Sequence, residues 1–462
     1  MLVGTFGVPW ITFVLARSIT RSQAVALAAG ITVLLYGPMF MWSLYSMADL
    51  TYGFFVLLSL YFAVRGFENP RWFIAMGVAL ALSYLAKSLG LIPVAGIVAY
   101  YAVTRIFQRP LLPFSRKDLF FALGMASMLL VLLPWFIRNT YYFGDPLYNN
   151  HKHVMGYLGW EPWEESTYAV YWDRELPTWM RKLREDPQRL MTDSLWHLYN
   201  HYRSLFIRVH PHLSLREENT ITVNSQENIP PFSLRDISTY WTGVPALAGI
   251  ACFLLLKLFR KNADAFKGFG LFLFTGGFQV LSLSMLWLPV NRLNTPLIPL
   301  VAIMGYATIH LFLKKASHRI ARKTGMITVL LCSLWSGFEL SDLAYARASQ
   351  GFPWKEAGEN VMSMADWIRE NIPDAKVMAR NAWALHFYSG VQTVRLPSGS
   401  MRDLIRVARH YGVTHICPDN NHPEFARWSR SGLSGLRPVH TTMGSVLFEI
   451  DYALIPAEYG KP

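Results

Sequence analysis

The sequence predicts a polytopic α-helical membrane protein of about ten spans with a small α/β domain at its C-terminal end. Three observations lead to this prediction. Hydrophobic residues make up 52% of the 462-residue chain, more than an ordinary soluble domain contains. These residues fall into stretches of near-span length. The joints between the stretches alternate between basic and nearly uncharged.

Each predicted span approaches the roughly 20 apolar residues that a helix needs to cross the hydrocarbon core of a bilayer. Three of the stretches are short, so their boundaries are soft. The predicted spans cover residues 1–17, 24–44, 48–65, 72–86, 89–105, 119–137, 239–256, 268–285, 294–313 and 325–342.

The charges in the short joints set the orientation. Seventeen lysine and arginine residues gather in every second joint, whereas the joints around Asp49, Lys87 and Arg292 hold one lysine and one arginine. Basic residues in short loops resist translocation, so the basic joints mark the cytoplasmic side. We therefore expect a multi-pass protein of the inner (cytoplasmic) membrane whose two long polar regions, including the C-terminal domain, lie on the extracytoplasmic (periplasmic) side.

This topology divides the chain into four regions. We predict an N-terminal bundle of six spans (1–137), an extracytoplasmic loop region (138–238), a C-terminal bundle of four spans (239–342) and an extracytoplasmic α/β domain (343–462). In the last region a helix-period apolar face ends at Pro373 and is followed by strand-like "VQTVRL", helical "MRDLIRVARHYG", and strand-like "THIC" and "SVLFEI". This alternation favours a sheet with helical crossovers.

The beginning of the chain departs from the expected topology. By the charge bias the first span runs from outside to inside, which places Met1 on the outer face without a signal peptide to carry it there. We therefore expect a further span upstream of Met1.

Composition excludes several other classes of protein. A net charge of +13 fits nucleic-acid binding only when basic residues cluster on one folded surface, and here they lie in short runs between apolar stretches. Three widely spaced cysteines indicate neither a disulfide framework nor a cysteine-based metal site. His151 and His153 have a spacing that a strand could use for a metal, but no further ligand accompanies them. We therefore favour two surface histidines over a metal site at these positions.

Two ionisable residues interrupt the apolar stretches at the predicted outer face. Asp49 lies where the second span gives way to the third, and Lys87 interrupts more than thirty apolar residues. A carboxylate there can simply cap the third span, and a lysine can reach the lipid headgroups. Yet charges within membrane segments are costly and are functional candidates by default. Ser88, Gly90 and Pro93 break the helix beside Lys87, and the exposed N–H groups of a broken helix suit a phosphate.

Two arginines join these residues at the same predicted face. Arg138 follows the sixth span in "LPWFIRNTYYFGDPLYNN", and Arg292 lies in "LWLPVNRLNTPLIPL" among three prolines. A guanidinium is a forked donor for phosphate. Convergence of Asp49, Lys87, Arg138 and Arg292 around one hollow would suit an anionic, lipid-borne ligand. Asn139 and Asp145, in the same segment as Arg138, are candidates for the acceptor side.

The ordered set of motifs resembles a known family. "YSMADLTYGFFVLLSLYFAVRG", "GVALALSYLAKSLGLIP", "PWFIRNTYYFGDPLY", "NRLNTPLIPLVAIMGYA" and "WIRENIPDAKVMARN" are similar to segments of the polytopic glycosyltransferases of the GT-C fold. The nearest branch is glycosyltransferase family 39, with the protein O-mannosyltransferases and the lipid A aminoarabinose transferase. The resemblance covers nearly the whole chain in order.

The resemblance implies transfer of a sugar from a polyprenyl-phosphate carrier to an acceptor at the outer side of the membrane. Family members use a carboxylate of the first outer loop as general base and basic residues to hold the carrier phosphate. By motif, Asp49 corresponds to a second acidic position, and Lys87, Arg138 and Arg292 correspond to residues that hold the phosphate. The sequence identifies neither the sugar nor the acceptor, and it leaves a divalent metal open.

By this resemblance the sequence opens in the family's second span. We expect the first span and the first outer loop with the primary acidic motif to precede Met1, because the start is misassigned or the sequence is a fragment. Otherwise the protein lacks its base and is inactive. Two alternatives to an active glycosyltransferase therefore stay open: a non-catalytic family member and a transporter of lipids or solutes. Transporters tend to place charges near the bilayer midplane in paired halves. Here the charges lie at one face and the halves do not repeat.

Overall fold

The computed structural model describes residues 6–35, 48–108, 114–148, 179–202, 268–285, 296–315, 353–397, 401–418, 434–442 and 445–456, with positions 246, 248, 250 and 459. The chain divides into two compact units. The helical unit comprises Met1–Asn149 and Gln188–Ala344, and the α/β unit comprises Asn150–Pro187 and Tyr345–Pro462. Each is described by itself.

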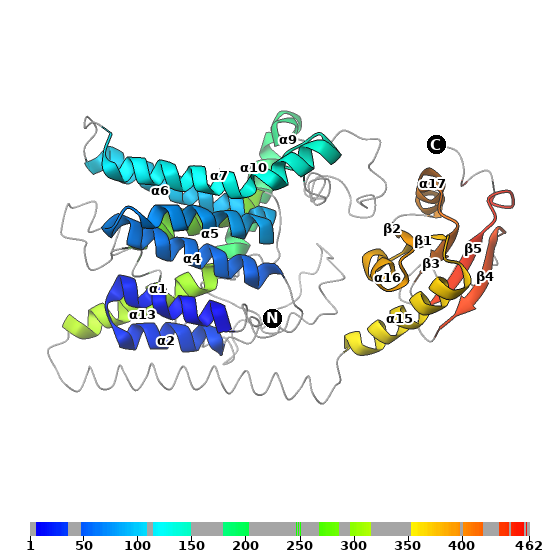
Figure 1. Cartoon of the computed structure of the whole chain (residues 1–462), viewed down its shortest axis with the longest axis horizontal. Helices are drawn as coiled ribbons and strands as arrows, with labels where there is room; N and C mark the ends of the chain where they lie inside the picture. The colour runs from blue at the N-terminus through cyan, green and yellow to red at the C-terminus, as the bar shows by residue number, and fades with distance from the viewer. Residues whose placement is uncertain are drawn as a thin grey trace. The chain divides into compact units, whose positions relative to one another are not determined.

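The helical unit is a bundle of mainly apolar helices, several of which lie side by side (Figure 1). The predicted helical class is thereby confirmed. Its elements are α1 (Val8–Thr20), α2 (Gln23–Leu34), α4 (Ala48–Glu68), α5 (Trp72–Ala86), the short 3-10 helix η2 (Ser88–Gly90), α6 (Leu91–Gln108), α7 (Arg116–Phe143), α10 (Pro187–Tyr202), α12 (Phe269–Met285) and α13 (Leu297–Lys315).

Among the described residues, three segments are long and apolar enough to cross a membrane: Ala48–Glu68, Ser88–Ile106 and Arg116–Phe143. They coincide with the predicted spans at 48–65, 89–105 and 119–137. Helices α1, α2, α5, α12 and α13 are apolar but shorter. The predicted spans at 239–256 and 325–342 lie outside the continuously described ranges, so the total of ten spans stays a prediction.

Local sequence signals set the helix ends. The Ser22 side chain accepts a hydrogen bond from the Val25 N–H and begins α2. At the start of α7, Ser115 and Asp118 form a capping box in which each side chain bonds the other's backbone N–H. Gly144, with a positive φ of 70°, ends α7 in the left-handed conformation that glycine adopts without strain.

Glycine residues allow two helix pairs to approach closely. A Cβ added at Gly77 of α5 would lie 1.8 Å from the Gly124 carbonyl oxygen of α7. A Cβ added at Gly96 of α6 would lie 2.6 Å from Cα of Thr275 in α12. Small residues at such crossings allow helices in lipid to pack through their backbones. These crossings fix α5 against α7 and α6 against α12.

Hydrogen bonds also join early and late parts of the helical unit. The Tyr52 hydroxyl of α4 donates to Gln279 Oε1 of α12 over 3.0 Å. The hydroxyls of Thr32 in α2 and Tyr306 in α13 lie 2.7 Å apart and share a hydrogen bond. Buried polar groups in an apolar bundle must find such partners because no water replaces them.

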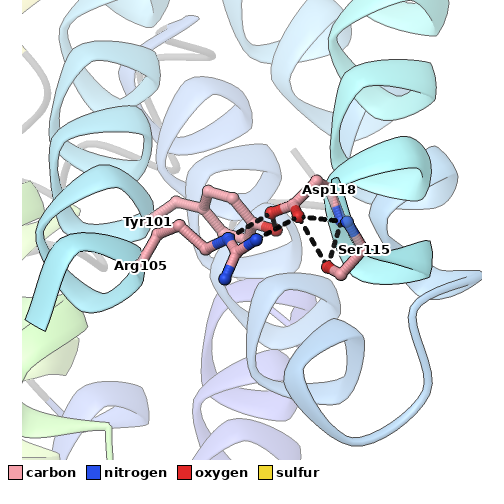
Figure 2. A network of polar contacts seen from close by, with 4 residues as sticks. All are labelled: Tyr101, Arg105, Ser115 and Asp118. Atoms are coloured by element: carbon pink, nitrogen blue, oxygen red, sulfur yellow. Dashed lines mark hydrogen bonds and ion pairs between the residues drawn. The ribbon is translucent and has the colours of Figure 1, made fainter. Parts of the chain in front are cut away.

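A polar network closes the joint between α6 and α7 (Figure 2). Asp118 accepts hydrogen bonds from the Tyr101 hydroxyl at 2.8 Å and from Arg105 Nε at 3.0 Å. Its other oxygen accepts from the Ser115 N–H at 2.7 Å and from the Ser115 hydroxyl at 2.6 Å. Asp118 therefore neutralises a basic residue of the predicted cytoplasmic joint and caps α7 at the same time.

The α/β unit contains a five-stranded sheet in the order β2-β1-β3-β5-β4. Strand β1 pairs in parallel with both β2 and β3, whereas β5 pairs antiparallel with β3 and β4. In chain order its elements are α9 (Trp179–Glu185), α15 (Pro353–Asn371), β1 (Lys376–Ala379), α16 (Ala382–Ser389), β2 (Gln392–Arg395), α17 (Met401–Tyr411), β3 (His415–Cys417), β4 (Leu436–Thr441) and β5 (Val446–Ile450).

Two apolar layers cover the sheet. Leu404, Ile405 and Ala408 of α17 pack with Met378 and Ile416. Met364, Ala365 and Ile368 of α15 and Leu385 of α16 pack with Val377 and Leu447. Adjacent residues of β1, Val377 and Met378, contribute to different layers because successive strand side chains point to opposite faces. The helix and strand segments that were predicted in the tail coincide with α15, β2, α17, β3 and β5.

Candidate functional site

The two candidate residues from successive predicted outer joints meet in the structure. Asp49 lies in the first turn of α4, and Lys87 is the C-cap residue of α5. Because α4 and α5 run antiparallel as a hairpin, the start of the first and the end of the second are neighbours. The Lys87 ammonium forms an ion pair and hydrogen bond with Asp49 Oδ1. The sequence placed these residues at one face, and the structure adds that they contact each other.

The ion pair is largely removed from solvent. The Asp49 side chain is 7% exposed and the Lys87 side chain is 24% exposed. Desolvation of two charges costs several kcal/mol per ion and is recovered only with good geometry. The carboxylate also gains from its place in the first turn of α4, where the helix dipole favours an anion.

The backbone break at Lys87 has a steric cause. Lys87 adopts an extended conformation, with φ −159° and ψ 130°, between α5 and η2. The Gly90 N–H then donates to the Lys87 carbonyl at 2.8 Å and closes a tight turn. A Cβ at Gly90 would lie 2.4 Å from the Tyr84 nitrogen, so this turn requires glycine. The turn holds the Lys87 side chain beside the start of α4.

A second polar layer lies one helical turn further along α4. Tyr52 is fully buried, and its hydroxyl donates to Gln279, which is 1% exposed. Sequence analysis did not select this pair. The available signal was Gln279 itself, an amide within the apolar stretch "GLFLFTGGFQVLSL". Its partner lies 227 positions away, and no local pattern reveals it.

Arg138 lies near the end of α7 among aromatic rings. Its guanidinium carbon lies 5.0 Å from the centroid of the Trp135 ring, 5.7 Å from Tyr142 and 5.9 Å from Phe143. Cations are attracted to the faces of such rings at these distances. The sequence explains these aromatic residues as an interfacial belt. In the structure they also surround Arg138, the candidate residue for binding a phosphate.

The end of α7 lies beside the end of α5. Phe73 contacts Phe121 at 5.3 Å between ring centroids, and Tyr84 contacts Phe136 at 5.9 Å. Contacts that advance along both helices show that α5 and α7 run parallel. Lys87 and Arg138 therefore occupy the same end of the bundle, as the predicted topology requires. They form two separate sets of contacts, one with Asp49 and one with the rings of α7.

Asn139 and Asp145 shape the turn that follows α7. Asn139 is 1% exposed, accepts a hydrogen bond from Arg138 Nη1 at 3.1 Å and donates to the carbonyls of Pro146 and Tyr148. Asp145 Oδ1 accepts from the Leu147 N–H at 2.9 Å. Both residues have structural partners, and their predicted role on the acceptor side stays a prediction.

Three further candidate residues belong to the part of the chain that the structure does not describe. Arg292 lies outside the described residues, as do His151 and His153. The hollow shared by Asp49, Lys87, Arg138 and Arg292 therefore also stays a prediction. Within the described ranges, no group of three or more His, Cys, Asp or Glu side chains is arranged to hold a metal ion.

One family model matches the part of the chain that contains the ion pair of Asp49 and Lys87. Residues 2–143 match the family model described as dolichyl-phosphate-mannose-protein mannosyltransferase. The predicted family resemblance is confirmed over this segment. The matched residues include Asp49, Lys87 and Arg138, and the match indicates a membrane enzyme of the glycosyltransferase type. No curated protein sequence matches the chain.

Two solved structures were compared with the whole chain. The crystal structure of ArnT from Cupriavidus metallidurans bound to undecaprenyl phosphate is 15% identical, with a TM-score of 0.37, over 98% of this chain and 84% of that chain. The apo structure of the same protein is 16% identical, with a TM-score of 0.38, over 98% of this chain and 83% of that chain.

Proposed function

We propose that this chain is a membrane glycosyltransferase that moves a sugar from a polyprenyl-phosphate carrier to an acceptor at the extracytoplasmic face. The family match over residues 2–143 supports the reaction class. The alternation of basic and uncharged joints supports the side of the membrane, because Asp49 and Lys87 lie at the end of the helices that is poor in basic residues.

The observation that carries the proposal is the ion pair between Asp49 and Lys87. A buried ion pair often adds no net stability compared with a well-packed apolar pair, so its presence in an apolar bundle calls for another explanation. Charged groups within membrane segments commonly mark substrate sites. Here the ammonium lies at the break between α5 and η2, and the carboxylate lies in the first turn of α4, where the helix dipole favours an anion.

The pair suits the charge changes of sugar transfer. The acceptor hydroxyl oxygen attacks the anomeric carbon, and the bond from that carbon to the phosphate oxygen breaks with its electrons passing to the phosphate. In the proposed scheme Asp49 accepts the hydroxyl proton. Protonation removes the counter-ion of Lys87, whose ammonium then balances the charge growing on the leaving phosphate. Attack opposite the leaving group inverts the anomeric carbon.

The remaining candidates have supporting roles in this scheme. Arg138, held over the rings of Trp135, Tyr142 and Phe143, presents a guanidinium at the same end of the bundle and suits the carrier phosphate. Arg292 is proposed for the same task, and Asn139 and Asp145 for the acceptor side. No residue of the chain selects one sugar over another.

Exchanging the charges of Asp49 and Lys87 tests whether their ion pair is catalytic or only structural. We compare transfer from a polyprenyl-phosphate sugar by the wild type, by Lys87→Ala and by the double variant Asp49→Lys with Lys87→Asp. The double variant retains one positive and one negative side chain at the same two positions, so it is expected to insert and fold. Its transfer activity is expected to be lost because the acid and base positions are exchanged.

The control is Arg65→Ala, which removes an exposed charge from the other end of α4. This variant is expected to keep full transfer. Full activity of Lys87→Ala or of the exchanged variant, at normal levels in the membrane, would refute the proposed role. It would favour a purely structural pair, as in a non-catalytic family member.

A further inference from the structure

A groove on the α/β unit has the volume and the polar lining of a small-molecule binding site. It lies between α16, the edge strand β2 and the end of α17, and has a volume of about 520 Å³. We call it the α16 groove. Its lining includes Lys376, Ala382, His386, Gln392, Thr393 and Tyr411. This volume is within the range of small-molecule sites, which hold a few placed polar groups.

Three polar side chains of the groove are fixed by hydrogen bonds to the backbone. Lys376 Nζ donates to the Tyr411 carbonyl at 2.9 Å, and the Thr393 hydroxyl donates to the Ala382 carbonyl at 2.8 Å. His386 Nδ1 lies 2.6 Å from the Val391 carbonyl. These bonds hold the side chains in place before any ligand arrives, which reduces the entropic cost of binding.

The fixed groups offer both donors and acceptors. A carbonyl oxygen only accepts, so His386 Nδ1 carries the proton and Nε2 of the neutral ring is an acceptor. The Lys376 ammonium has three N–H groups, of which the bond to Tyr411 uses one. Gln392 adds an amide that both donates and accepts. A ligand with several hydroxyl groups matches such a mixture better than an anion, which accepts only.

Exposed aromatic rings adjoin these polar groups. A second hollow of about 650 Å³ includes His386 in its lining together with Phe387, Tyr388 and Gly390. Phe387 is 80% exposed although α16 buries its neighbour Leu385 in the core. The Phe387 and Tyr388 rings meet edge to face, with centroids 5.1 Å apart. The face of an aromatic ring is negative and attracts the weakly positive C–H groups of a sugar ring.

We propose that the α16 groove, together with the adjoining hollow that shares His386 with it, binds a saccharide of the size of a di- or trisaccharide. Its hydroxyl groups would bond Lys376, His386 and Gln392, and a sugar face would pack on Phe387. Saccharide binding by the groove does not depend on catalysis. Only the role of the groove as a docking site for a saccharide acceptor rests on the proposed function. The inference thereby adds an acceptor class that the helical unit leaves open.

Binding is tested on the full chain in lipid nanodiscs without any lipid-linked donor. The probes are mannotriose and chitotriose, observed by saturation-transfer difference NMR, and an extended Thr-Val hexapeptide, which tests addition to the free edge of β2 instead. The wild type is expected to saturate at least one trisaccharide. Phe387→Ala and His386→Ala are expected to weaken its binding by about tenfold.

Two controls keep the result interpretable. Leu454→Ala removes another exposed apolar side chain of the same unit, 61% exposed, outside the groove lining and is expected to bind as the wild type does. Lys87→Ala is expected to abolish transfer and retain trisaccharide binding, so failure of the proposed function and failure of this inference give different results. Phe387 is exposed, so its replacement is not expected to unfold the unit.

Three outcomes would overturn the inference. The first is the absence of saturation for both trisaccharides. The second is unchanged binding in Phe387→Ala and His386→Ala. The third is binding of the hexapeptide in place of the sugars, which would assign the groove to an extended polypeptide.

Discussion

Replacement of Gly77 by alanine is expected to destabilise the helical unit. An added Cβ would lie 1.8 Å from the Gly124 carbonyl oxygen and 2.5 Å from the Ser127 hydroxyl. Carbon atoms of this kind are essentially never found closer than 3.0 Å to another heavy atom. Helices α5 and α7 must therefore separate or tilt by roughly 1.2 Å at this crossing.

The separation has two costs. Forcing a methyl group into a close-packed contact typically costs about 1–3 kcal/mol. The Ser127 hydroxyl also shares its proton between the Gly124 carbonyl at 2.8 Å and the Ile74 carbonyl of α5 at 3.1 Å, and separation of the helices would weaken the second bond by up to about 1 kcal/mol. The better helix propensity of alanine offsets up to about 1 kcal/mol. We expect a net loss of about 2 kcal/mol in the free energy of unfolding.

Gly277 of α12 supplies a matched control. A Cβ at this position meets no atom of the described residues within 4 Å, so Gly277→Ala changes helix propensity without a clash among them. Unfolding of both variants is measured by titration with sodium dodecyl sulfate in mixed micelles, followed by circular dichroism. Gly277→Ala is expected to be as stable as the wild type or slightly more stable. If Gly77→Ala unfolds at the same detergent fraction as Gly277→Ala, the backbone contact between α5 and α7 is not as close as described.

Three further predictions concern individual polar groups. Tyr52→Phe removes the hydroxyl that donates to the buried Gln279 amide and should lower stability by about 1–2 kcal/mol in the same titration. Adding Gln279→Leu should recover part of this loss, and additive losses would count against the bond. Asp118→Ala removes one half of the capping box of α7 and an ion-pair partner of Arg105, and should cost about 1 kcal/mol. Ser115→Ala should then have a smaller effect in this variant than in the wild type, and independent effects would contradict the shared network. Burial lowers the pKa of His415 below its ordinary value, and the charge of Glu449 opposes this only in part. The folded chain therefore binds fewer protons than the unfolded chain, and the α/β unit should lose stability as the pH falls through about 6.5. Hydrogen exchange of the β3 amides should show this loss, and His415→Gln should reduce it.

Features that depend on neighbouring residues could be predicted from the sequence. The charge pattern placed Asp49 and Lys87 at one face because Asp49 lies at the start of one span, Lys87 follows the end of the next, and successive spans reverse direction. Residues 401–411 coincide with α17, whose apolar period buries Leu404, Ile405 and Ala408. Gly90 beside Lys87 indicated a break in the helix, and the structure shows a turn that only glycine can adopt.

Features that depend on distant pairing could not be predicted. The sequence predicts that Asp49 and Lys87 lie near one hollow at the same face, and only the hairpin geometry shows that they form an ion pair with each other. Arg138 and its surrounding rings are local in sequence, yet whether Trp135, Tyr142 and Phe143 face lipid or the guanidinium depends on the helix rotation. Asn139 is an acceptor-side candidate by position, whereas its buried amide holds two backbone carbonyls.

The hydrogen bonds between early and late helices have a consequence for biosynthesis. Tyr52 and Thr32 leave the ribosome long before their partners Gln279 and Tyr306, which follow 227 and 274 positions later. During this interval two hydroxyl groups of α4 and α2 have no native partner in the bilayer. The first helices must therefore either keep these groups beside water or the insertion machinery, or satisfy them temporarily with one another. Unless the hydroxyls pair with one another, release of the N-terminal helices into lipid waits until α12 and α13 have been synthesised.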